Sequence, residues 1–113
     1  MIIVTGTPFS GKSTLCQSIP AIELPLLDAI KQASALKSQN IQFKVIYLKC
    51  ASDIAVNRAL AAFGQSVFQH ISKIMDYREP HTAQLKLWFD DVTVVNTDAG
   101  INLNMFEGNH ASN

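Results

Sequence analysis

A glycine-rich stretch that directly follows an apolar run constrains the fold of this chain more than any other feature. The run is Met-Ile-Ile-Val at residues 1–4, and Gly-Thr-Pro-Phe-Ser-Gly-Lys-Ser-Thr stands at residues 6–14. A short continuous apolar run is typical of a strand in a parallel sheet, so we expect a strand over residues 2–5. Helix-compatible residues come next, which predicts a short helix over residues 12–19 that stops before Pro20. Strand, tight loop and helix are therefore predicted in that order.

The stretch at 6–14, hereafter the 6–14 loop, has the pattern Gly-x-x-x-x-Gly-Lys-Ser of a phosphate-binding loop, or P-loop. Its glycines allow backbone conformations in which several N–H groups turn inward and form a nest for an anion. The lysine would bring a positive charge to the β- and γ-phosphates, the serine would ligate Mg²⁺, and the helix would point its positive end at the phosphates. The residues expected to bind ATP with Mg²⁺ are Gly6, Thr7, Pro8, Phe9, Ser10, Gly11, Lys12, Ser13 and Thr14, with Ser13 as the metal ligand.

The bulk properties limit the classes of protein to which this chain can belong. Its 113 residues suggest one domain, over residues 1–107, with a polar tail at 108–113. Lys+Arg and Asp+Glu both number 9, so no broad field attracts nucleic acid or an anionic membrane, and zero net charge favours self-association. Two cysteines without metal-ligand spacing, no span of membrane length and no signal peptide together predict a cytoplasmic protein.

Strands that alternate with helices indicate an α/β fold. A small parallel sheet of about three to four strands, flanked by helices in the three-layer arrangement of P-loop NTPases, is expected. Pro25 makes residues 21–27 ambiguous. Loops at 6–12, after Leu48 and at 96–100 should converge at the carboxyl edge of the sheet, where ligands bind. The other expected elements are strands at 43–48 and 92–95, helices at 29–39 (capped by Asp28), 53–63 (capped by Ser52 and ended by Gly64) and 66–77, a weaker helix at 82–89, and a short closing helix after Gly100.

The chain resembles the P-loop kinases of the nucleotide and polynucleotide kinase group, in particular small phage-type proteins. Residues 6–14 match the phosphate loop, and residues 45–58 resemble the strand, turn and helix that introduce the lid. Residues 68–80, followed by residues 88–98, resemble the end of these kinases. The resemblance implies that Arg58 is a lid cation that closes over the phosphates. It also implies that Asp98 lies on the loop that borders the adenine, where it would touch the base or ribose or form an Asx turn.

The middle of the chain departs from this family, which usually has two further strands after the P-loop helix. One of these strands ends in an Asp that holds Mg²⁺ through water or acts as a base. Here only residues 20–42 fill the gap, and their carboxylates are Glu23 and Asp28. Asp28 is expected either to cap the next helix or to take the missing catalytic role.

Our leading hypothesis is an ATP-binding phosphotransferase that moves the γ-phosphate to a hydroxyl or phosphate of a nucleotide-like acceptor. Lys12, Arg58 and Asp28 are its candidate catalytic residues. The alternative is a nucleotide-binding regulatory or pseudo-kinase module. No stable nucleic-acid or membrane binding is expected. A homodimer through an unpaired edge of the first strand is possible, unless residues 21–27 fold back as a short edge strand.

Overall fold

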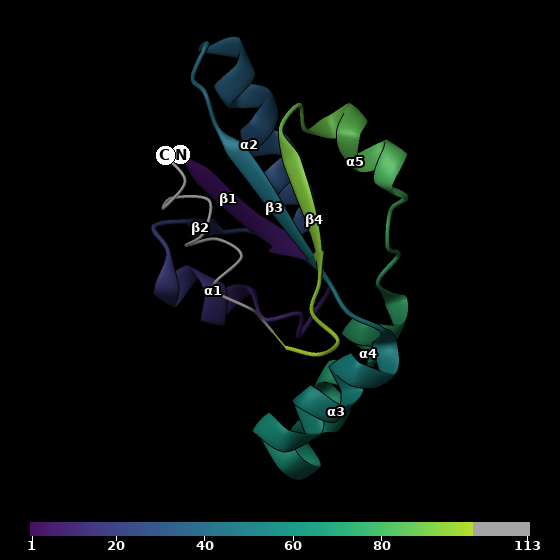
Figure 1. Cartoon of the computed structure of the whole chain (residues 1–113). Helices are drawn as coiled ribbons and strands as arrows, with labels where there is room; N and C mark the ends of the chain where they lie inside the picture. Colours follow the sequence, from purple (N-terminus) through teal and green to yellow (C-terminus); the bar gives the residue numbers. More distant parts are fainter. Residues whose placement is uncertain (101–113) are drawn as a thin grey trace.

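An all-parallel sheet of four strands, in the order β2-β1-β3-β4, organises the computed structural model, which describes residues 1–100 (Figure 1). The predicted α/β fold with a small parallel sheet flanked by helices is therefore confirmed. Strand β1 pairs with β3 along its whole length, from Ile2 opposite Lys44 to Gly6 opposite Leu48. The strands are β1 (Ile2–Gly6), β2 (Ile22–Glu23), β3 (Lys44–Lys49) and β4 (Val92–Asn96).

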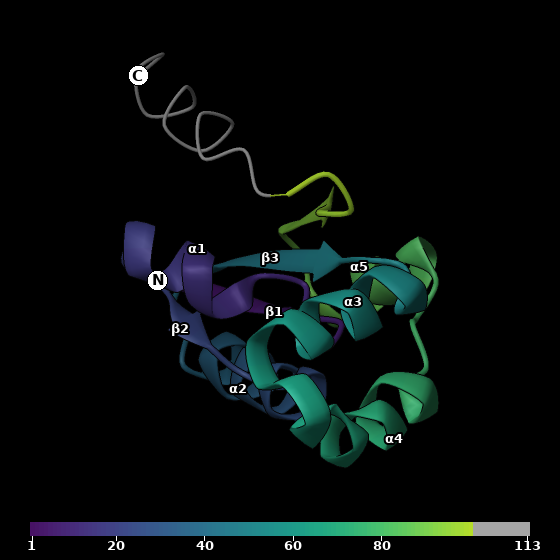
Figure 2. The same cartoon turned by 90° about the horizontal axis from the view of Figure 1, so that it is seen from below.

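Helices cover both faces of this sheet. Helix α1 packs through Leu15 against Val4 and Leu48 on one face, while α2 and α5 pack on the other (Figure 2). The arrangement follows from the sequence, because successive residues of a strand point to opposite faces. The helices are α1 (Lys12–Ser18), α2 (Leu26–Ser38), α3 (Ser52–Phe63), the 3₁₀-helix η1 (Gly64–Val67), α4 (Phe68–Asp76) and α5 (Thr82–Trp88).

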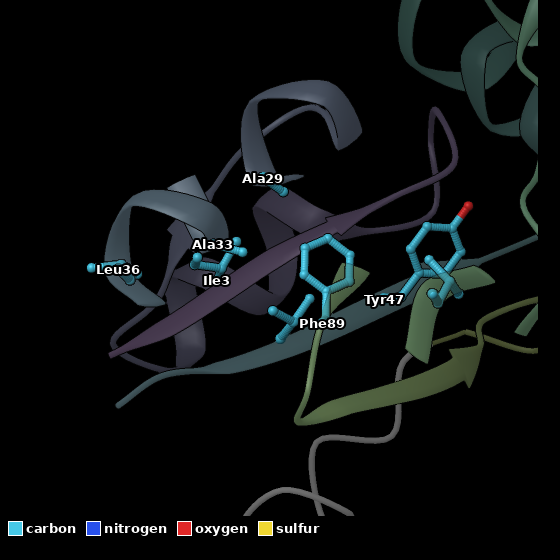
Figure 3. Packing of buried hydrophobic residues seen from close by; sticks show 8 residues of the cluster. Ile3, Ala29, Ala33, Leu36, Tyr47 and Phe89 are labelled. Carbon is cyan, nitrogen blue, oxygen red and sulfur yellow. The ribbon is translucent and has the colours of Figure 1, made fainter. Parts of the chain in front are cut away.

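The larger core lies between the sheet and α2 and α5 (Figure 3). Ile3 of β1 and Tyr47 of β3 meet Phe89 there, and all three are fully buried. Small residues at Ala29 and Ala33 leave α2 smooth on this face, so the helix can approach the sheet closely. Truncation of Phe89 to alanine in such a core typically costs about 3–5 kcal/mol.

Helices α3 and α4 form a hairpin beyond the carboxyl edge of the sheet (Figure 1). The hairpin has a small core of its own, in which Ala59, Val67 and Ile74 are buried together with Cys50 from the end of β3. Phe9 of the 6–14 loop packs against the same cluster. The loop is therefore in contact with the hairpin as well as with the sheet.

The ambiguous segment at 21–27 resolves as an edge strand followed by a helix. Ile22 and Glu23 pair in parallel with Ile3 and Val4, and the Leu24 N–H continues the ladder to the Val4 carbonyl at 3.0 Å. The unpaired side expected for the first strand is thus wrong, and the alternative, in which residues 21–27 fold back as a short edge strand, is confirmed by the pairing of β2 with β1. The premise of the homodimer prediction is not met.

Two predicted helix caps are also wrong. Helix α2 begins at Leu26 with Pro25 as its N-cap, so Asp28 lies inside the first turn and forms no side-chain cap. Proline fixes a φ near −65° that suits the residue at a helix start, which explains the earlier beginning. Helix α3 has Ala51 rather than Ser52 as its N-cap. The closing helix after Gly100, the domain end at 107 and the tail at 108–113 lie outside the described residues.

Within residues 1–100, none of the helices has both the length and the apolar character needed to cross a lipid bilayer.

Candidate functional site

The 6–14 loop starts where β1 touches β3 most closely, and Gly6 makes that approach possible. A Cβ at Gly6 would lie 1.9 Å from the carbonyl oxygen of Leu48, and the φ of Gly6 is +146°. The next residue, Thr7, donates its N–H to the same Leu48 carbonyl at 3.0 Å. Only glycine fits this position, and it turns the chain out of the sheet and into the loop.

The backbone of the loop is wound so that several N–H groups remain available. Gly11 has a φ of +99° and Phe9 a φ of +59°, both in the left-handed region. Within residues 1–100, the N–H groups of Phe9, Gly11, Lys12, Ser13 and Thr14 donate to no carbonyl. Successive N–H groups in such a conformation form a concavity that suits an anion.

Lys12 lies over this concavity. Its Nζ donates to the carbonyl oxygens of Thr7 at 2.8 Å and Gly6 at 3.3 Å. Burial lowers the pKa of Lys12, while Glu23 and Cys50 oppose that shift. A half-buried ammonium whose hydrogen bonds within residues 1–100 go to neutral carbonyls gains from an anion that enters the loop.

Ser13 pairs with the carboxylate of Glu23 from the end of β2. Its hydroxyl lies 2.9 Å from Oε2 and 3.1 Å from Oε1. A serine that donates its hydrogen keeps both oxygen lone pairs for a cation, and carboxylate and hydroxyl oxygens are ligands that suit Mg²⁺. Within residues 1–100, no group of three His, Cys, Asp or Glu side chains could hold a metal ion, at this position or at any other. These two side chains fit a metal whose remaining ligands come from phosphates and water.

Arg58 of α3 and Thr97 after β4 hold the loop from its other side. The Arg58 guanidinium donates to the carbonyl of Phe9 at 2.9 Å, to the Thr97 hydroxyl at 3.2 Å and to the Thr97 carbonyl. The fully buried Thr97 hydroxyl in turn donates to the Ser10 carbonyl at 2.7 Å. Arg58 therefore fixes the Phe9 carbonyl of the loop and ties it to Thr97, instead of standing free as a cation.

Further contacts bring the three predicted loops together. The Cys50 N–H donates to the Thr7 hydroxyl at 3.0 Å, and the Ala51 N–H donates to Oδ1 of Asp98 at 2.8 Å. The Asp98 N–H donates to Oδ1 of Asn96 at 2.8 Å. The side chain that forms the Asx turn is therefore that of Asn96 and not that of Asp98. The convergence of these loops at the carboxyl edge is confirmed.

The hairpin reaches the loop through an aromatic cluster. The ring of Phe9 meets Phe63 and His70 edge-on, with centroids 5.9 and 5.6 Å away, while Phe63 and His70 stack at 4.2 Å. This packing holds Phe9 in its left-handed conformation, which a bulky residue rarely adopts.

Not every predicted site residue joins this group. Asp28 is exposed in the first turn of α2, and among the described residues no hydrogen bond or ion pair links it to the loop. The side chain of Thr14 is exposed on α1. Three residues that the P-loop motif does not include contact the loop instead: Glu23, Cys50 and Thr97. Each of them ends a strand or directly follows one at the carboxyl edge of the sheet.

The comparisons with known proteins leave the family open: no family model matches the chain, and no curated protein matches it.

Proposed function

We propose that the 6–14 loop is a P-loop that binds the phosphates of a nucleoside triphosphate, as in the small kinases that the chain resembles. The observation that carries this proposal is a set of loop N–H groups that have no carbonyl partner within residues 1–100 and lie beside the Lys12 ammonium, in a loop whose shape Gly6 and Gly11 determine. Fixed donors with a half-buried positive charge suit a multiply charged anion. Neutral ligands would leave that ammonium unpaired.

Mg²⁺ fits the same site. Ser13 would ligate it, and Glu23 would hold it directly or through water, because their oxygens already lie together at the end of β2. The metal would neutralise charge on the bound phosphates. Glu23 replaces Asp28 as the metal-linked carboxylate in this proposal.

The activity that we propose is transfer of the γ-phosphate of ATP to a nucleotide-like acceptor. Lys12 would stabilise charge on the transferred group, and Arg58 would act on the reaction by fixing the Phe9 carbonyl of the loop. A regulatory module without transfer is the second candidate. The contacts that tie the loop to α3 and to the end of β4 favour it, since they would pass on a change in the loop.

Calorimetry of ATP with Mg²⁺ tests the nucleotide site. Lys12→Ala should weaken binding by about 2–3 kcal/mol, which is roughly a 30- to 150-fold rise in Kd. Lys31→Ala, at an exposed position of α2, is the matched control and should leave Kd unchanged. Equal affinities for wild type and Lys12→Ala would refute the assignment. Turnover with a panel of acceptors then separates the kinase from the regulatory module.

A further inference from the structure

A pocket of about 230 Å³ opens beside the 6–14 loop, on the side away from Glu23 and Ser13. It lies between the loop, the end of β3, the start of α3, helix α4 and the segment that follows α4. Pockets that enclose a whole drug-sized molecule usually exceed about 300 Å³, so this one suits a single sugar-sized group. Its lining includes Thr7, Pro8, Ala55, Ile74, Tyr77 and Glu79.

Two polar side chains from the segment after α4 face this pocket. Tyr77 and Glu79 both line it, and the negative charge of Glu79 adds to the rise that burial causes in the pKa of Tyr77. The Tyr77 hydroxyl is bonded to that of Tyr47, whose ring is fully buried in the core and whose oxygen points away from Phe89 (Figure 3). The pocket thus has a carboxylate and a phenol close to each other.

The tyrosine pair leaves one hydroxyl hydrogen for a ligand. The hydrogen bond between the Tyr47 and Tyr77 hydroxyls uses one of their two hydrogens, so one hydrogen stays available. The Tyr77 hydroxyl, which lines the pocket, can exchange hydrogen bonds with a ligand there, while the Glu79 carboxylate can only accept.

A hydroxyl satisfies both of these groups at once, since it donates one hydrogen bond and accepts others. A phosphate dianion only accepts and would be repelled by the Glu79 carboxylate. No lysine or arginine stands among the described residues that line the pocket. Lys12 reaches the pocket wall only through its bond to the Thr7 carbonyl. The charges of the pocket therefore favour an uncharged acceptor.

We propose that this pocket holds the sugar end of an uncharged nucleoside, whose hydroxyl lies between Glu79 and Tyr77 and receives the phosphoryl group. This inference rests on the proposed function and narrows its acceptor to a hydroxyl. Thr7 and Pro8 belong both to the 6–14 loop and to the pocket wall, so the two sites adjoin.

The transfer balances with these groups. The acceptor oxygen forms a bond to the γ-phosphorus of ATP, and the bond between that phosphorus and the bridging oxygen of ADP breaks. ADP leaves with the electron pair of that bond, and the hydroxyl proton passes to the Glu79 carboxylate. Glu23 remains with Ser13, so the carboxylates on the two sides of the loop have different tasks.

The test compares ribonucleosides with their 5′-monophosphates as acceptors for the full chain with ATP and Mg²⁺. Nucleosides should be phosphorylated and monophosphates should not. Glu79→Gln, which keeps the shape and removes the charge, should lower kcat about 100-fold with no change in the Kd of ATP, because a positioned base typically contributes 10²–10⁴-fold. Asp76→Asn, at an exposed position of α4 outside the pocket, is the control and should turn over like wild type.

Binding is also read without turnover, from the methyl signals of Ile74 and Ala55 in the pocket wall. A nucleoside should shift both signals, and Tyr77→Phe should weaken that effect. Three results would overturn this inference while ATP still binds: transfer to monophosphates only, wild-type turnover by Glu79→Gln, or unshifted methyl signals. If wild type does not bind ATP, the proposed function fails and this inference fails with it.

Discussion

Substitution of Gly6 by alanine tests the geometry on which the whole loop depends. The added Cβ would meet the carbonyl oxygen of Leu48 at 1.9 Å, and also the carbonyl carbon and nitrogen of Leu48 at 2.8 and 2.9 Å. All three are backbone atoms of β3 in the middle of the sheet, so no flexible side chain can move aside. The strand ends must separate, or the loop must leave its conformation.

The magnitude follows from two contributions. A residue with a Cβ held at a φ of +146° costs about 1–3 kcal/mol. Separation of the strand ends breaks the bond from Thr7 to Leu48 and weakens its neighbour in the ladder, at about 1 kcal/mol each. The free energy of unfolding should therefore fall by about 3–5 kcal/mol, a large part of the roughly 5–15 kcal/mol of a typical domain.

Urea unfolding followed by circular dichroism measures this loss. With a slope of about 2 kcal/mol per M, the midpoint should fall by about 2 M. Gly64→Ala is the matched control: its φ is +57°, but an added Cβ meets nothing within 4 Å. That variant should lose only about 1 kcal/mol, or about 0.5 M. Midpoints that agree for both variants would show that the close approach of β1 and β3 is not what requires glycine.

Other substitutions separate the roles of single side chains. Arg58→Lys keeps the charge but loses the branched guanidinium that reaches both Phe9 and Thr97, so it should lower the free energy of unfolding by about 1–2 kcal/mol and weaken ATP binding. Arg78→Lys, at an exposed position, is the control and should change neither quantity. Calorimetric and unfolding curves of Arg58→Lys that match wild type would contradict the role of Arg58 in holding the loop. Burial raises the pKa of Tyr47 in the folded state above the ordinary tyrosine value of about 10, so the folded state holds the hydroxyl proton more tightly than the unfolded state does. This contribution to the free energy of unfolding is fully present below about pH 10 and is lost as the pH rises further. Tyr47→Phe should therefore show a shallower fall in unfolding free energy above pH 10, and a slope equal to wild type would exclude this cause. Asp28→Asn should cost under about 1 kcal/mol and leave turnover intact, while loss of activity would restore Asp28 to the site.

Most elements of the fold could be predicted because their signals are local. The apolar run before Gly6, the β-branched and aromatic residues at 43–48 and the helical spacing in 53–63 all gave boundaries within a residue of those observed. The two residues of β2 could not be found in this way. Ile22 and Glu23 are too few to show a period, and only their pairing with β1 makes them a strand.

The positions of some residues of the candidate site could also be predicted from the sequence. Lys12 and Ser13 followed from the motif, and the convergence of the loops followed from the topology. The positions of Glu23 beside Ser13 and of Asp28 on the first turn of α2 could not be predicted, because they depend on which side of Pro25 the chain pairs with the sheet. The contact of Thr97 with the loop could not be predicted, because a lone threonine after a strand forms no sequence pattern. Its full burial and its hydrogen bond to the Ser10 carbonyl are visible only in the structure.

The described sheet contains only parallel strand pairs and therefore no β-hairpin, which has a consequence for how the chain folds. Strand β1 finds its partners only at residues 22–23 and 44–49, so loop-closure entropy must be overcome before a single ladder bond forms. Until β3 arrives, the Ile-Ile-Val run of β1 is an apolar segment with open backbone groups. Refolding should thus be slow and sensitive to protein concentration, and aggregation would begin at β1, the strand that later positions the 6–14 loop.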